Sequence, residues 1–330
     1  MPTEARAIRI TAPGGPEVLK LDRLEVRDPG PGEVLVEVAA AGLNRADCLQ
    51  RRGVYPAPPG TVPDVPGLEF AGRVAKLGAE VRDLRVGDEV MAIASGGAMA
   101  THIVAHAREL VRVPRGLDLV QAAAIPEVFM TAYDAVFLQG GLALGQYALV
   151  HAIGSGIGTA ALQLIHASGA FCIGTSRKAD KLERVAALGL VHGIETATPT
   201  FADQVKEITG GRMAQVVLDT VGGAYLAENI RAIAPGGTIV TIGMLGGAKA
   251  ELPLGMLVAK RAGLRGSVLR SRPIEEKIEL AQAFGARVCP LFARGALHPI
   301  VEEVLPMASI QHAHERMESD GLLGKLVLSW

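Results

Sequence analysis

The sequence has few cysteines and few aromatic residues, and it lacks any long run of basic residues. Its three cysteines, Cys48, Cys172 and Cys289, are odd in number and far apart. They therefore form neither a disulfide framework nor a Cys-x-x-Cys metal pair, and we expect a protein of a reducing compartment, the cytosol. The 33 lysines and arginines nearly balance the 34 aspartates and glutamates. Nucleic-acid binding needs clustered positive charge, so we expect no nucleic-acid partner.

We also expect neither a signal peptide nor a membrane-spanning segment. Residues 1–6 have no apolar core of the signal-peptide kind. The most apolar long stretch, residues 148–174, contains His151, His166 and several glycines. These residues favour buried strand, loop and helix over a bilayer span. We therefore expect no membrane partner.

Glycine and aliphatic residues are abundant instead. Glycine accounts for 40 of the 330 residues, and 49% of the chain is hydrophobic, which excludes intrinsic disorder. At about 150 residues per domain, this length suggests two domains. In the first 120 residues, short alternating or β-branched segments at 5–10, 19–26 and 33–41 are separated by Gly/Pro turns. This spacing predicts a small β-barrel or sandwich.

The pattern changes near residue 118, where a helical period begins that extends over residues 119–140. Strands and helices then alternate, which predicts βαβ units and a doubly wound parallel sheet. We expect strands at residues 147–152, 171–174, 215–219 and 238–243, and helices at 158–168, 179–188, 202–209 and 224–232. After Gly266 the elements are mixed, and residues 325–329 are expected to form a strand.

A glycine-rich loop follows the first strand of this alternating region. Gly154, Gly156 and Gly158 are spaced i, i+2, i+4, so the strict G-x-G-x-x-G pattern is not met. Small residues let the backbone approach a diphosphate, and a helix N-terminus presents free N–H groups to it. A purely structural turn is the alternative, but the βαβ setting favours a dinucleotide site.

The end of the second strand indicates which dinucleotide is bound. An NAD site usually has a carboxylate here, whereas this chain has Ser176, Arg177, Lys178 and Lys181. A solvated basic first turn is the alternative interpretation. Cations at a helix N-terminus are unfavourable without an anion, so we expect a 2′-phosphate there and NADPH as the cofactor.

Several further motifs extend this pattern along the chain, at residues 41–47, 52–60, 65–72, 86–92, 124–127, 151–158, 219–223, 266–272 and 324–328. With them the sequence resembles the medium-chain dehydrogenase/reductase superfamily, specifically its zinc-free quinone oxidoreductase (ζ-crystallin-like) branch. It looks most similar to the stress-inducible human quinone oxidoreductase subgroup. The resemblance implies an α/β protein with a GroES-like, β-rich catalytic domain (residues 1–122 and 270–330) and a Rossmann NADP-binding domain (residues 123–269). It also implies a homodimer joined through the strand near residues 264–269.

Zinc-dependent members of this superfamily take catalytic ligands from a Cys and a His at positions that hold Asn44 and Leu68 here. Neither residue ligates zinc tightly, and three cysteines cannot supply a four-cysteine structural lobe. Without a Lewis acid, the resemblance implies acceptors that take a hydride readily, such as quinones and activated alkenes.

The resemblance also implies roles for individual residues. Asn44, Tyr55 and Thr131 would line the cleft beside the nicotinamide, where the reaction occurs. The cofactor contacts would come from Ser155, Gly156, Ile157 and Gly158 (diphosphate), Ser176 and Lys181 with Arg177 beside them (2′-phosphate), Gly243, Met244 and Leu245 (carboxamide), and Lys325 (closing the groove).

Some of these side chains have simpler interpretations. Tyr55 either donates a proton or hydrogen bond to the acceptor, or packs among prolines in a surface loop. Glu127 is either a buried acid or a first-turn carboxylate that the helix dipole explains.

Three histidines and one cysteine are also expected to have no catalytic role. His151 fits a structural role, and we expect His312 and His314 on the surface. Cys48, with no histidine beside it in sequence, is expected to be a small buried apolar residue.

The sequence therefore predicts an NADPH-dependent, zinc-independent reductase of quinones or similar conjugated carbonyl compounds. One alternative is an enoyl- or haloacrylate-type alkene reductase with the same cofactor. The other is a nucleotide-binding protein with little catalysis.

Overall fold

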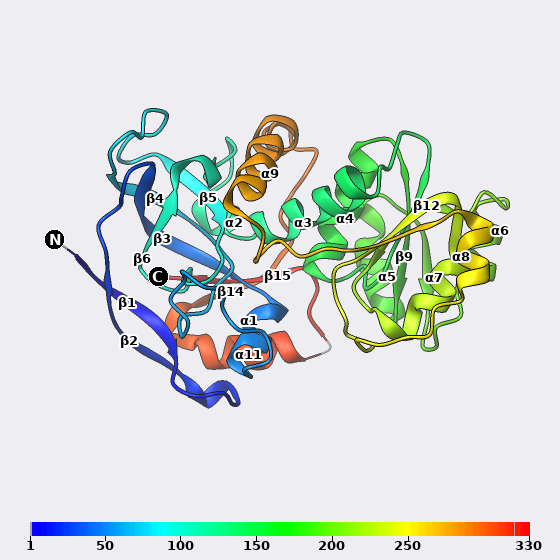
Figure 1. Cartoon of the computed structure of the whole chain (residues 1–330), viewed down its shortest axis with the longest axis horizontal. Coiled ribbons are helices and arrows are strands. Elements are labelled where there is room, and N and C mark those ends of the chain that lie inside the picture. The colour runs from blue at the N-terminus through cyan, green and yellow to red at the C-terminus, as the bar shows by residue number, and fades with distance from the viewer. Residues whose placement is uncertain (1, 320) are drawn as a thin grey trace. The chain divides into compact units, whose positions relative to one another are not determined.

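The computed structural model describes residues 2–319 and 321–330. Two compact units make up the chain: a first unit of Met1–Met130 with Leu269–Trp330, and a second unit of Thr131–Val268. In the colours of Figure 1 the second unit runs from green to yellow, and the first contains both termini. The domain ranges expected from the sequence, with their catalytic and cofactor-binding roles, stay predictions.

The first unit is built on a seven-stranded sheet whose central strand is β3 (Glu33–Leu43). The sheet order is β14-β15-β3-β4-β5-β7, β6 also pairs with β3, and β1 and β2 form a separate antiparallel ribbon. Alternate residues of β3, such as Val34, Val36 and Val38, are buried against Phe70 of β4, as a half-buried strand requires. The other elements of this unit are β1 (Thr3–Ile10), β2 (Leu19–Val26), α1 (Arg45–Arg51), β4 (Glu69–Leu77), β5 (Glu89–Ile93), β6 (His102–His106), β7 (Val111–Arg112), α2 (Leu119–Ala122), η3 (Pro126–Met130), α9 (Ile274–Arg287), α10 (Cys289–Ala293), β14 (Val301–Pro306), α11 (Ile310–Glu318) and β15 (Lys325–Ser329), with short 3₁₀ turns η1 (Pro16–Val18), η2 (Ala107–Glu109) and η7 (Met307–Ser309).

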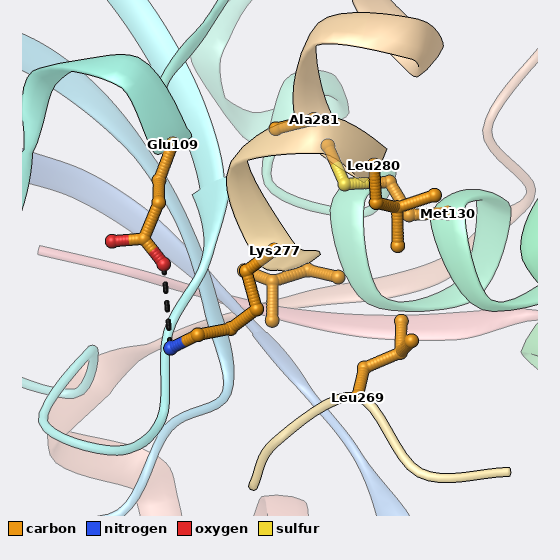
Figure 2. Close-up of a pocket in the computed structure, with 7 residues that line it drawn as sticks. Glu109, Met130, Leu269, Lys277, Leu280 and Ala281 are labelled. Atoms are coloured by element: carbon orange, nitrogen blue, oxygen red, sulfur yellow. Dashed lines mark ion pairs between the residues drawn. The ribbon is translucent and has the colours of Figure 1, made fainter. Parts of the chain in front are cut away.

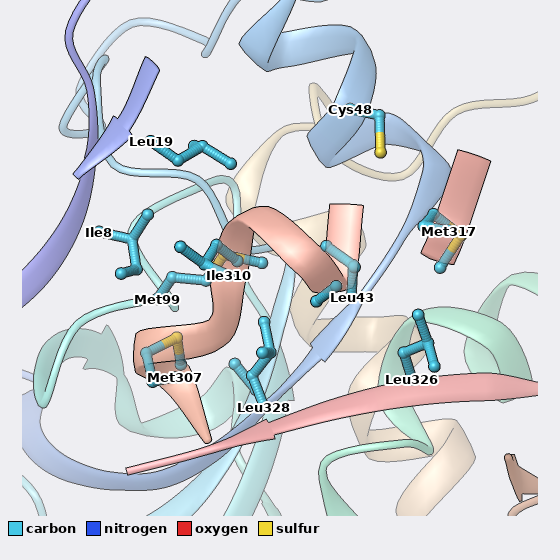
Figure 3. Close-up of a cluster of buried hydrophobic side chains, with 12 residues drawn as sticks. Ile8, Leu19, Leu43, Cys48, Met99, Met307, Ile310, Met317, Leu326 and Leu328 are labelled. Atoms are coloured by element: carbon cyan, nitrogen blue, oxygen red, sulfur yellow. The ribbon is translucent and has the colours of Figure 1, made fainter. Parts of the chain in front are cut away.

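Helix α11 covers the end of this sheet through a buried apolar cluster (Figure 3). Ile310 and Met317 lie on its buried face, because residues at i and i+7 share one side of a helix. His314 lies on this face too and is fully buried, whereas the His312 side chain is 57% exposed. The expectation that both histidines are on the surface is therefore wrong for His314.

The second unit contains a six-stranded parallel sheet in the order β10-β9-β8-β11-β12-β13. The expected fold class, a GroES-like β domain with a doubly wound parallel sheet, is confirmed. Helices α4 and α5 cover one face, and α6, α7 and α8 cover the other (Figure 1). The elements are α3 (Thr131–Tyr133), η4 (Asp134–Gln139), β8 (Tyr147–Val150), α4 (Gly156–Ala167), β9 (Phe171–Ser176), α5 (Ala179–Val185), η5 (Ala186–Leu188), β10 (Leu190–Glu195), α6 (Ala202–Ile208), β11 (Ala214–Asp219), η6 (Gly223–Tyr225), α7 (Leu226–Ala232), β12 (Ile233–Thr241), α8 (Leu254–Lys260) and β13 (Gly263–Gly266).

Several expected elements have other bounds in the structure, and two of these differences have an identifiable backbone cause. The helical period over residues 119–140 corresponds to the short helix α2 and, beyond it, to π-helical turns at Pro126–Met130 and Asp134–Gln139. Pro126 has no N–H to continue a helical ladder. Strand β8 ends at Val150, two residues early, because Ala152 has a left-handed backbone (φ +50°) that no strand adopts.

Candidate active site

The carboxyl ends of β8, β9, β11 and β12 meet at one edge of the second unit's sheet, because these strands are parallel. β8 and β11 are neighbours there although β9 and β10 separate them in the chain. Doubly wound sheets bind ligands outside this edge, at the point where the strand order reverses. Most of the predicted cofactor residues lie in the loops after these strands or in the strand ends and first helical turns beside them.

The glycine-rich loop joins β8 to α4. Ser155 precedes the helix, and its Oγ accepts a hydrogen bond from the N–H of Gly158 at 3.0 Å. The N–H groups of Gly156 and Ile157, in the first helical turn, have no intrahelical partners. A Cβ on Gly158 would lie 2.5 Å from the carbonyl oxygens of Ala152 and Ile153. The absence of a side chain at Gly158 therefore lets α4 pack closely against the residues that follow β8.

The three residues predicted to bind the 2′-phosphate lie at the end of β9 and after it. Ser176 ends the strand, is buried, and accepts the N–H of Lys178 through its Oγ at 3.1 Å. Arg177 is exposed, and Lys181 lies partly exposed in α5. Helix α5 has no side-chain cap at its start. Arg177 and Lys181 therefore place positive charge at the N-terminus of α5, a position where a bound anion is favoured.

The loop after β11 is tied to the loop after β12. Asp219 is buried, and its Oδ1 accepts the N–H groups of Val221 at 2.8 Å and Gly222 at 2.9 Å. The N–H of Gly246 donates to the carbonyl of Val221 at 2.7 Å. These bonds hold the two loops together at the sheet edge.

The predicted carboxamide-binding segment is part of this arrangement. Met244 and Leu245 are 64% and 65% exposed, and Gly243 lies beside Gly222. The N–H of Leu245 makes a long bond, 3.4 Å, to the carbonyl of Thr220. The segment thus presents an open backbone at the sheet edge.

Two buried hydroxyl groups in the second unit, those of Thr131 and Thr220, have no hydrogen-bond partner among the described residues. Buried hydroxyls usually have partners. Thr131 is a predicted site residue, whereas the sequence analysis did not select Thr220. The signal that could have found Thr220 is its place in Asp219-Thr-Val-Gly-Gly, directly after a strand of the sheet.

His151 is fully buried between two hydrogen-bond partners. Its Nδ1 lies 2.9 Å from Oγ1 of Thr175, and its Nε2 lies 2.7 Å from Oδ1 of Asn229. Asn229 in turn donates to Oδ2 of Asp219 at 3.1 Å. Burial lowers the pKa of His151, so the ring is neutral at pH 7. Both ring nitrogens thus have partners, as the structural interpretation of His151 requires.

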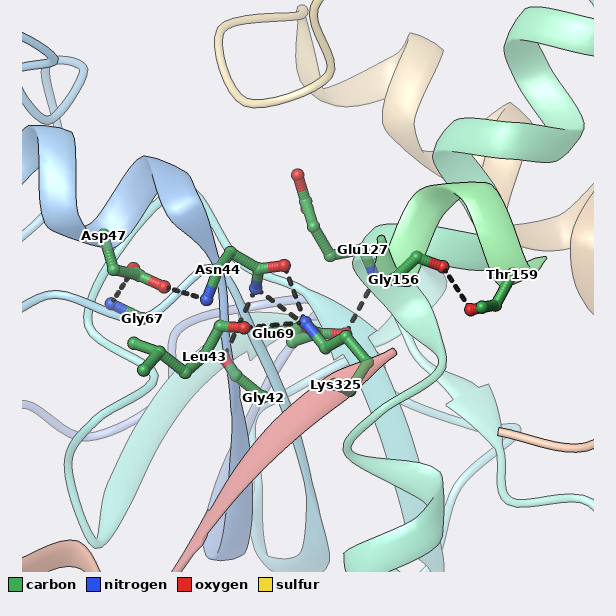
Figure 4. A network of polar contacts seen from close by, with 10 residues as sticks. All are labelled: Gly42, Leu43, Asn44, Asp47, Gly67, Glu69, Glu127, Gly156, Thr159 and Lys325. Atoms are coloured by element: carbon green, nitrogen blue, oxygen red, sulfur yellow. Dashed lines mark hydrogen bonds and ion pairs between the residues drawn. The ribbon is translucent and has the colours of Figure 1, made fainter. Parts of the chain in front are cut away.

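In the first unit, Asn44, Glu69 and Lys325 form a buried polar cluster (Figure 4). The ammonium of Lys325 lies 2.5 Å from Oε1 of Glu69, 2.7 Å from Oδ1 of Asn44 and 3.0 Å from the carbonyl of Leu43. Asn44 also donates from Nδ2 to Oε1 of Glu69 at 2.8 Å. Asn44 and Lys325, both predicted site residues, are therefore brought together, and the sequence analysis missed Glu69 at their centre.

Asp47, on α1, is a second buried carboxyl group in this region. It accepts the N–H of Asn44 at 2.9 Å and the N–H of Gly67 at 2.9 Å (Figure 4). Burial raises the pKa of Asp47 to about 6 despite these donors. Asp47 thus joins the segment that starts α1 to the segment that precedes β4.

Glu127 contacts the same cluster through its backbone. Its N–H donates to Oε2 of Glu69 at 2.9 Å. Its side chain is partly exposed and points away from Glu69 and Lys325 in Figure 4. Burial and the charge of Glu69 raise the pKa of Glu127 to about 8, so this carboxyl group is largely neutral at pH 7. A helix dipole alone does not explain that behaviour.

Arg270 holds Tyr55 in place. The guanidinium lies over the phenol ring at 4.8 Å and donates to the carbonyl of Tyr55 at 3.2 Å. It also donates to Oε1 of Gln50 at 2.6 Å and to the carbonyl of Ser95 at 2.7 Å. Burial raises the pKa of Tyr55. Tyr55 therefore lies in the loop after α1 as a half-buried residue, with Arg270 over its ring, and its role beside the acceptor stays a prediction.

A small pocket lies beside α9 (Figure 2). Met130, Leu269 and Leu280 contribute apolar walls. Lys277 pairs with Glu109 at 3.3 Å and donates to Oγ of Ser95 at 3.0 Å. Both charges are thus partnered, and nothing in the pocket resembles an acid–base site.

Cys48 is buried, as expected, but it does have a histidine neighbour. Its Sγ lies 3.5 Å from Nδ1 of His314, which the sequence places 266 residues away. Burial raises the pKa of Cys48 to about 12 and lowers that of His314 to about 3. The pair is therefore neutral and unsuited to nucleophilic catalysis.

Asn44, Tyr55 and Lys325 lie in the first unit, and the other predicted site residues lie in the second. Within residues 2–319 and 321–330, no group of three or more His, Cys, Asp or Glu side chains could hold a metal ion. The same residues contain no helix with the length and apolar character to cross a bilayer.

Comparison with known families agrees with this architecture. Residues 30–115 match the alcohol dehydrogenase GroES-like domain, and residues 156–286 match the zinc-binding dehydrogenase family. The second match begins at Gly156, within the glycine-rich loop, and includes the strands β9 to β13 of the parallel sheet.

Known proteins also resemble the whole chain. A quinone oxidoreductase of Pseudomonas aeruginosa is 33% identical over 98% of this chain and 99% of its own. The human synaptic vesicle membrane protein VAT-1 homolog is 29% identical over 98% of this chain and 86% of its own. The Escherichia coli quinone oxidoreductase solved with NADPH covers 99% of this chain and 100% of its own, with 28% identity and a TM-score of 0.86. The chain therefore belongs to the medium-chain dehydrogenase/reductase superfamily, in its quinone oxidoreductase/VAT-1-like subfamily.

Proposed function

We propose that this protein is a zinc-independent, NADPH-dependent reductase of quinones or similar conjugated carbonyl compounds. The observation that carries the proposal is the loop between β8 and α4. Ser155 uses its side chain to cap α4, and Gly158 allows the backbone an approach that a Cβ would block. A tight loop at a helix N-terminus is a site for a diphosphate.

The residues beyond β9 support NADPH over NADH. No carboxylate precedes Asp180 after the strand, and Ser176, Arg177 and Lys181 supply one hydroxyl and two cations. A carboxylate would bind a free ribose 2′-hydroxyl, whereas cations favour a 2′-phosphate. We place the carboxamide at the backbone of Gly243, Met244 and Leu245.

When bound, NADPH would supply a hydride from its nicotinamide C4, and the protein provides binding, orientation and electrostatics. Thr131 would face the nicotinamide with its buried hydroxyl. Asn44 and Tyr55 would orient the acceptor. Lys325 contributes positive charge to the cluster with Asn44 and Glu69, and we propose that it closes the cofactor groove.

Three finer assignments belong to this proposal. We propose that, within the family, the chain is most similar to the stress-inducible human quinone oxidoreductase subgroup. We also propose that the protein is cytosolic. We also propose a homodimer that pairs through β13, the edge strand of the parallel sheet, because an exposed edge strand offers unpaired N–H and C=O groups.

Calorimetry with NADPH and NADH tests the cofactor, and NADPH absorbance tests the reaction. We expect turnover with 9,10-phenanthrenequinone and 1,4-benzoquinone. The double variant R177A/K181A should bind NADPH at least about tenfold more weakly, with NADH binding unchanged. Equal catalytic efficiency with NADH and NADPH would contradict the NADPH preference.

The acceptor panel separates the alternatives. Turnover of α,β-unsaturated acids alone would identify an alkene reductase. Tight NADPH binding without oxidation by any acceptor would identify a nucleotide-binding protein.

A further inference from the structure

We propose that the carboxyl group of Glu127 donates the proton that completes reduction of the acceptor. This inference rests on the proposed function and adds a catalytic acid to it. Glu127 is the second residue of the π-helical turn Pro126–Met130. Such turns are rare and often occur at functional sites.

The backbone of Glu127 is fixed while its carboxyl group is left available. Its N–H is bonded to Oε2 of Glu69 at 2.9 Å. No hydrogen bond or ion pair of the Glu127 carboxyl group is found among the described residues, and the side chain is partly exposed. Figure 4 shows it directed away from Glu69 and Lys325. A proton donor needs this combination of fixed position and free oxygens.

Glu69, by contrast, has no free oxygen. Its Oε1 accepts from Lys325 at 2.5 Å and from Asn44 at 2.8 Å, and its Oε2 accepts the N–H of Glu127. Both carboxylate oxygens of Glu69 are therefore hydrogen-bonded. The negative charge of Glu69 in turn favours the neutral form of Glu127, because two adjacent carboxylates repel each other.

Four further groups interact electrostatically with Glu127. Asp47 adds to the repulsion, whereas Lys325 and Arg270 oppose it, and Tyr55 is the nearby neutral acid. Burial and Glu69 outweigh the cations, so the pKa of Glu127 rises to about 8. The carboxyl group then holds its proton at neutral pH and releases it readily to a stronger base.

The proton balance of the reaction requires such a group. The acceptor gains an electron pair and one hydrogen from NADPH, which is oxidised to NADP⁺. The reduced acceptor is then an oxyanion, either a hydroquinone monoanion or an enolate. The O–H bond of Glu127 breaks as an O–H bond forms on a hydroquinone, or a C–H bond on an enolate carbon. Glu127 is left as a carboxylate, which water reprotonates.

Tyr55 is the competing donor. Its pKa is raised above the ordinary phenol value by burial, which makes it a weaker acid than Glu127 at neutral pH. Arg270 lies over its ring at 4.8 Å, and we assign Tyr55 to holding the acceptor. Catalytic acids work best with a pKa near the working pH, and Glu127 meets this condition.

The experiment compares E127Q and Y55F with the wild type and with E109Q, a control that removes a partly exposed carboxylate paired with Lys277 elsewhere in the same unit. We expect wild-type kcat for quinone reduction to fall as pH rises through about 8. E127Q should lose about 10²–10⁴-fold in kcat and should lack this pH dependence, with NADPH affinity unchanged. Y55F and E109Q should keep the wild-type pH dependence of kcat. An E127Q profile identical to the wild-type profile would overturn the inference.

A second measurement does not depend on turnover. Infrared difference spectra of the free protein report carboxyl protonation, and we expect a group titrating near pH 8 in the wild type and E109Q but not in E127Q. A Glu127 carboxyl that is already ionised at pH 6 overturns the inference even if quinones are reduced. Absence of quinone reduction by wild-type protein overturns the proposed function, and with it the donor role, even if that titration is present.

Discussion

The ammonium of Lys325 lies 2.5 Å from Oε1 of Glu69, and both side chains are buried. Lys325 opens the strand β15, and Glu69 opens the strand β4. The pair joins elements that are 256 residues apart in sequence. Asn44 and the carbonyl of Leu43 complete the hydrogen bonding of the ammonium, so the charge is fully partnered.

Removal of one partner of the Lys325–Glu69 pair should lower the stability of the folded protein. K325M leaves Glu69 buried without its cation, and we expect the free energy of unfolding to fall by about 3–5 kcal/mol in urea titrations. The double variant K325M/E69Q removes both charges and should recover part of that loss. A K325M variant within about 0.5 kcal/mol of the wild type would contradict this account.

Gly158 should tolerate no side chain. An added Cβ would lie 2.5 Å from two carbonyl oxygens, so G158A forces the loop or α4 to shift, which costs about 1–3 kcal/mol in stability. Calorimetry should show NADPH affinity at least about tenfold lower. The matched control is G255A in α8, where nothing lies within 4 Å of the added Cβ. That variant should bind NADPH normally and be as stable as the wild type or more so.

Arg270 should hold the Tyr55 segment in place. R270M removes the donors to Gln50, Ser95 and Tyr55, and we expect about 2–3 kcal/mol of lost stability. Limited proteolysis should cut the segment around residues 55–63 faster, because local opening becomes easier. R294M, at an exposed position, is the control and should change neither result. Unchanged proteolysis in R270M would show that Arg270 does not order this segment.

Glu127 should also make stability depend on pH. Its pKa is about 8 in the folded protein and about 4.3 in an unfolded chain. The folded state therefore retains a proton that the unfolded state releases, so the free energy of unfolding falls as pH rises from about 5 to about 8. Because Glu127 is partly exposed, we expect this fall in the free energy of unfolding to be only about 2 kcal/mol. Urea titrations should show that E127Q lacks this fall between pH 7 and 8, above the titration of Asp47.

The sequence determined the architecture because its signals are local. Alternation of strands and helices from residue 147, with small residues at 154–158 directly after a strand, predicted the parallel sheet and the loop before α4, the helix that Ser155 caps. Hydrophobic period and glycine placement act over a few residues, so they can be read without the fold. The element ends were less predictable, since the left-handed backbone of Ala152 shortens β8.

Only the tertiary structure decided which charges meet. Nothing local to Lys325 indicates Glu69, and nothing local to Cys48 indicates His314, because these partners are more than 250 residues apart. The neutral state of Glu127 likewise depends on burial and on the ionised Glu69 beside it. Desolvation and Coulomb energies depend on distances that folding creates, so the sequence supplies the titratable groups and the fold sets their protonation.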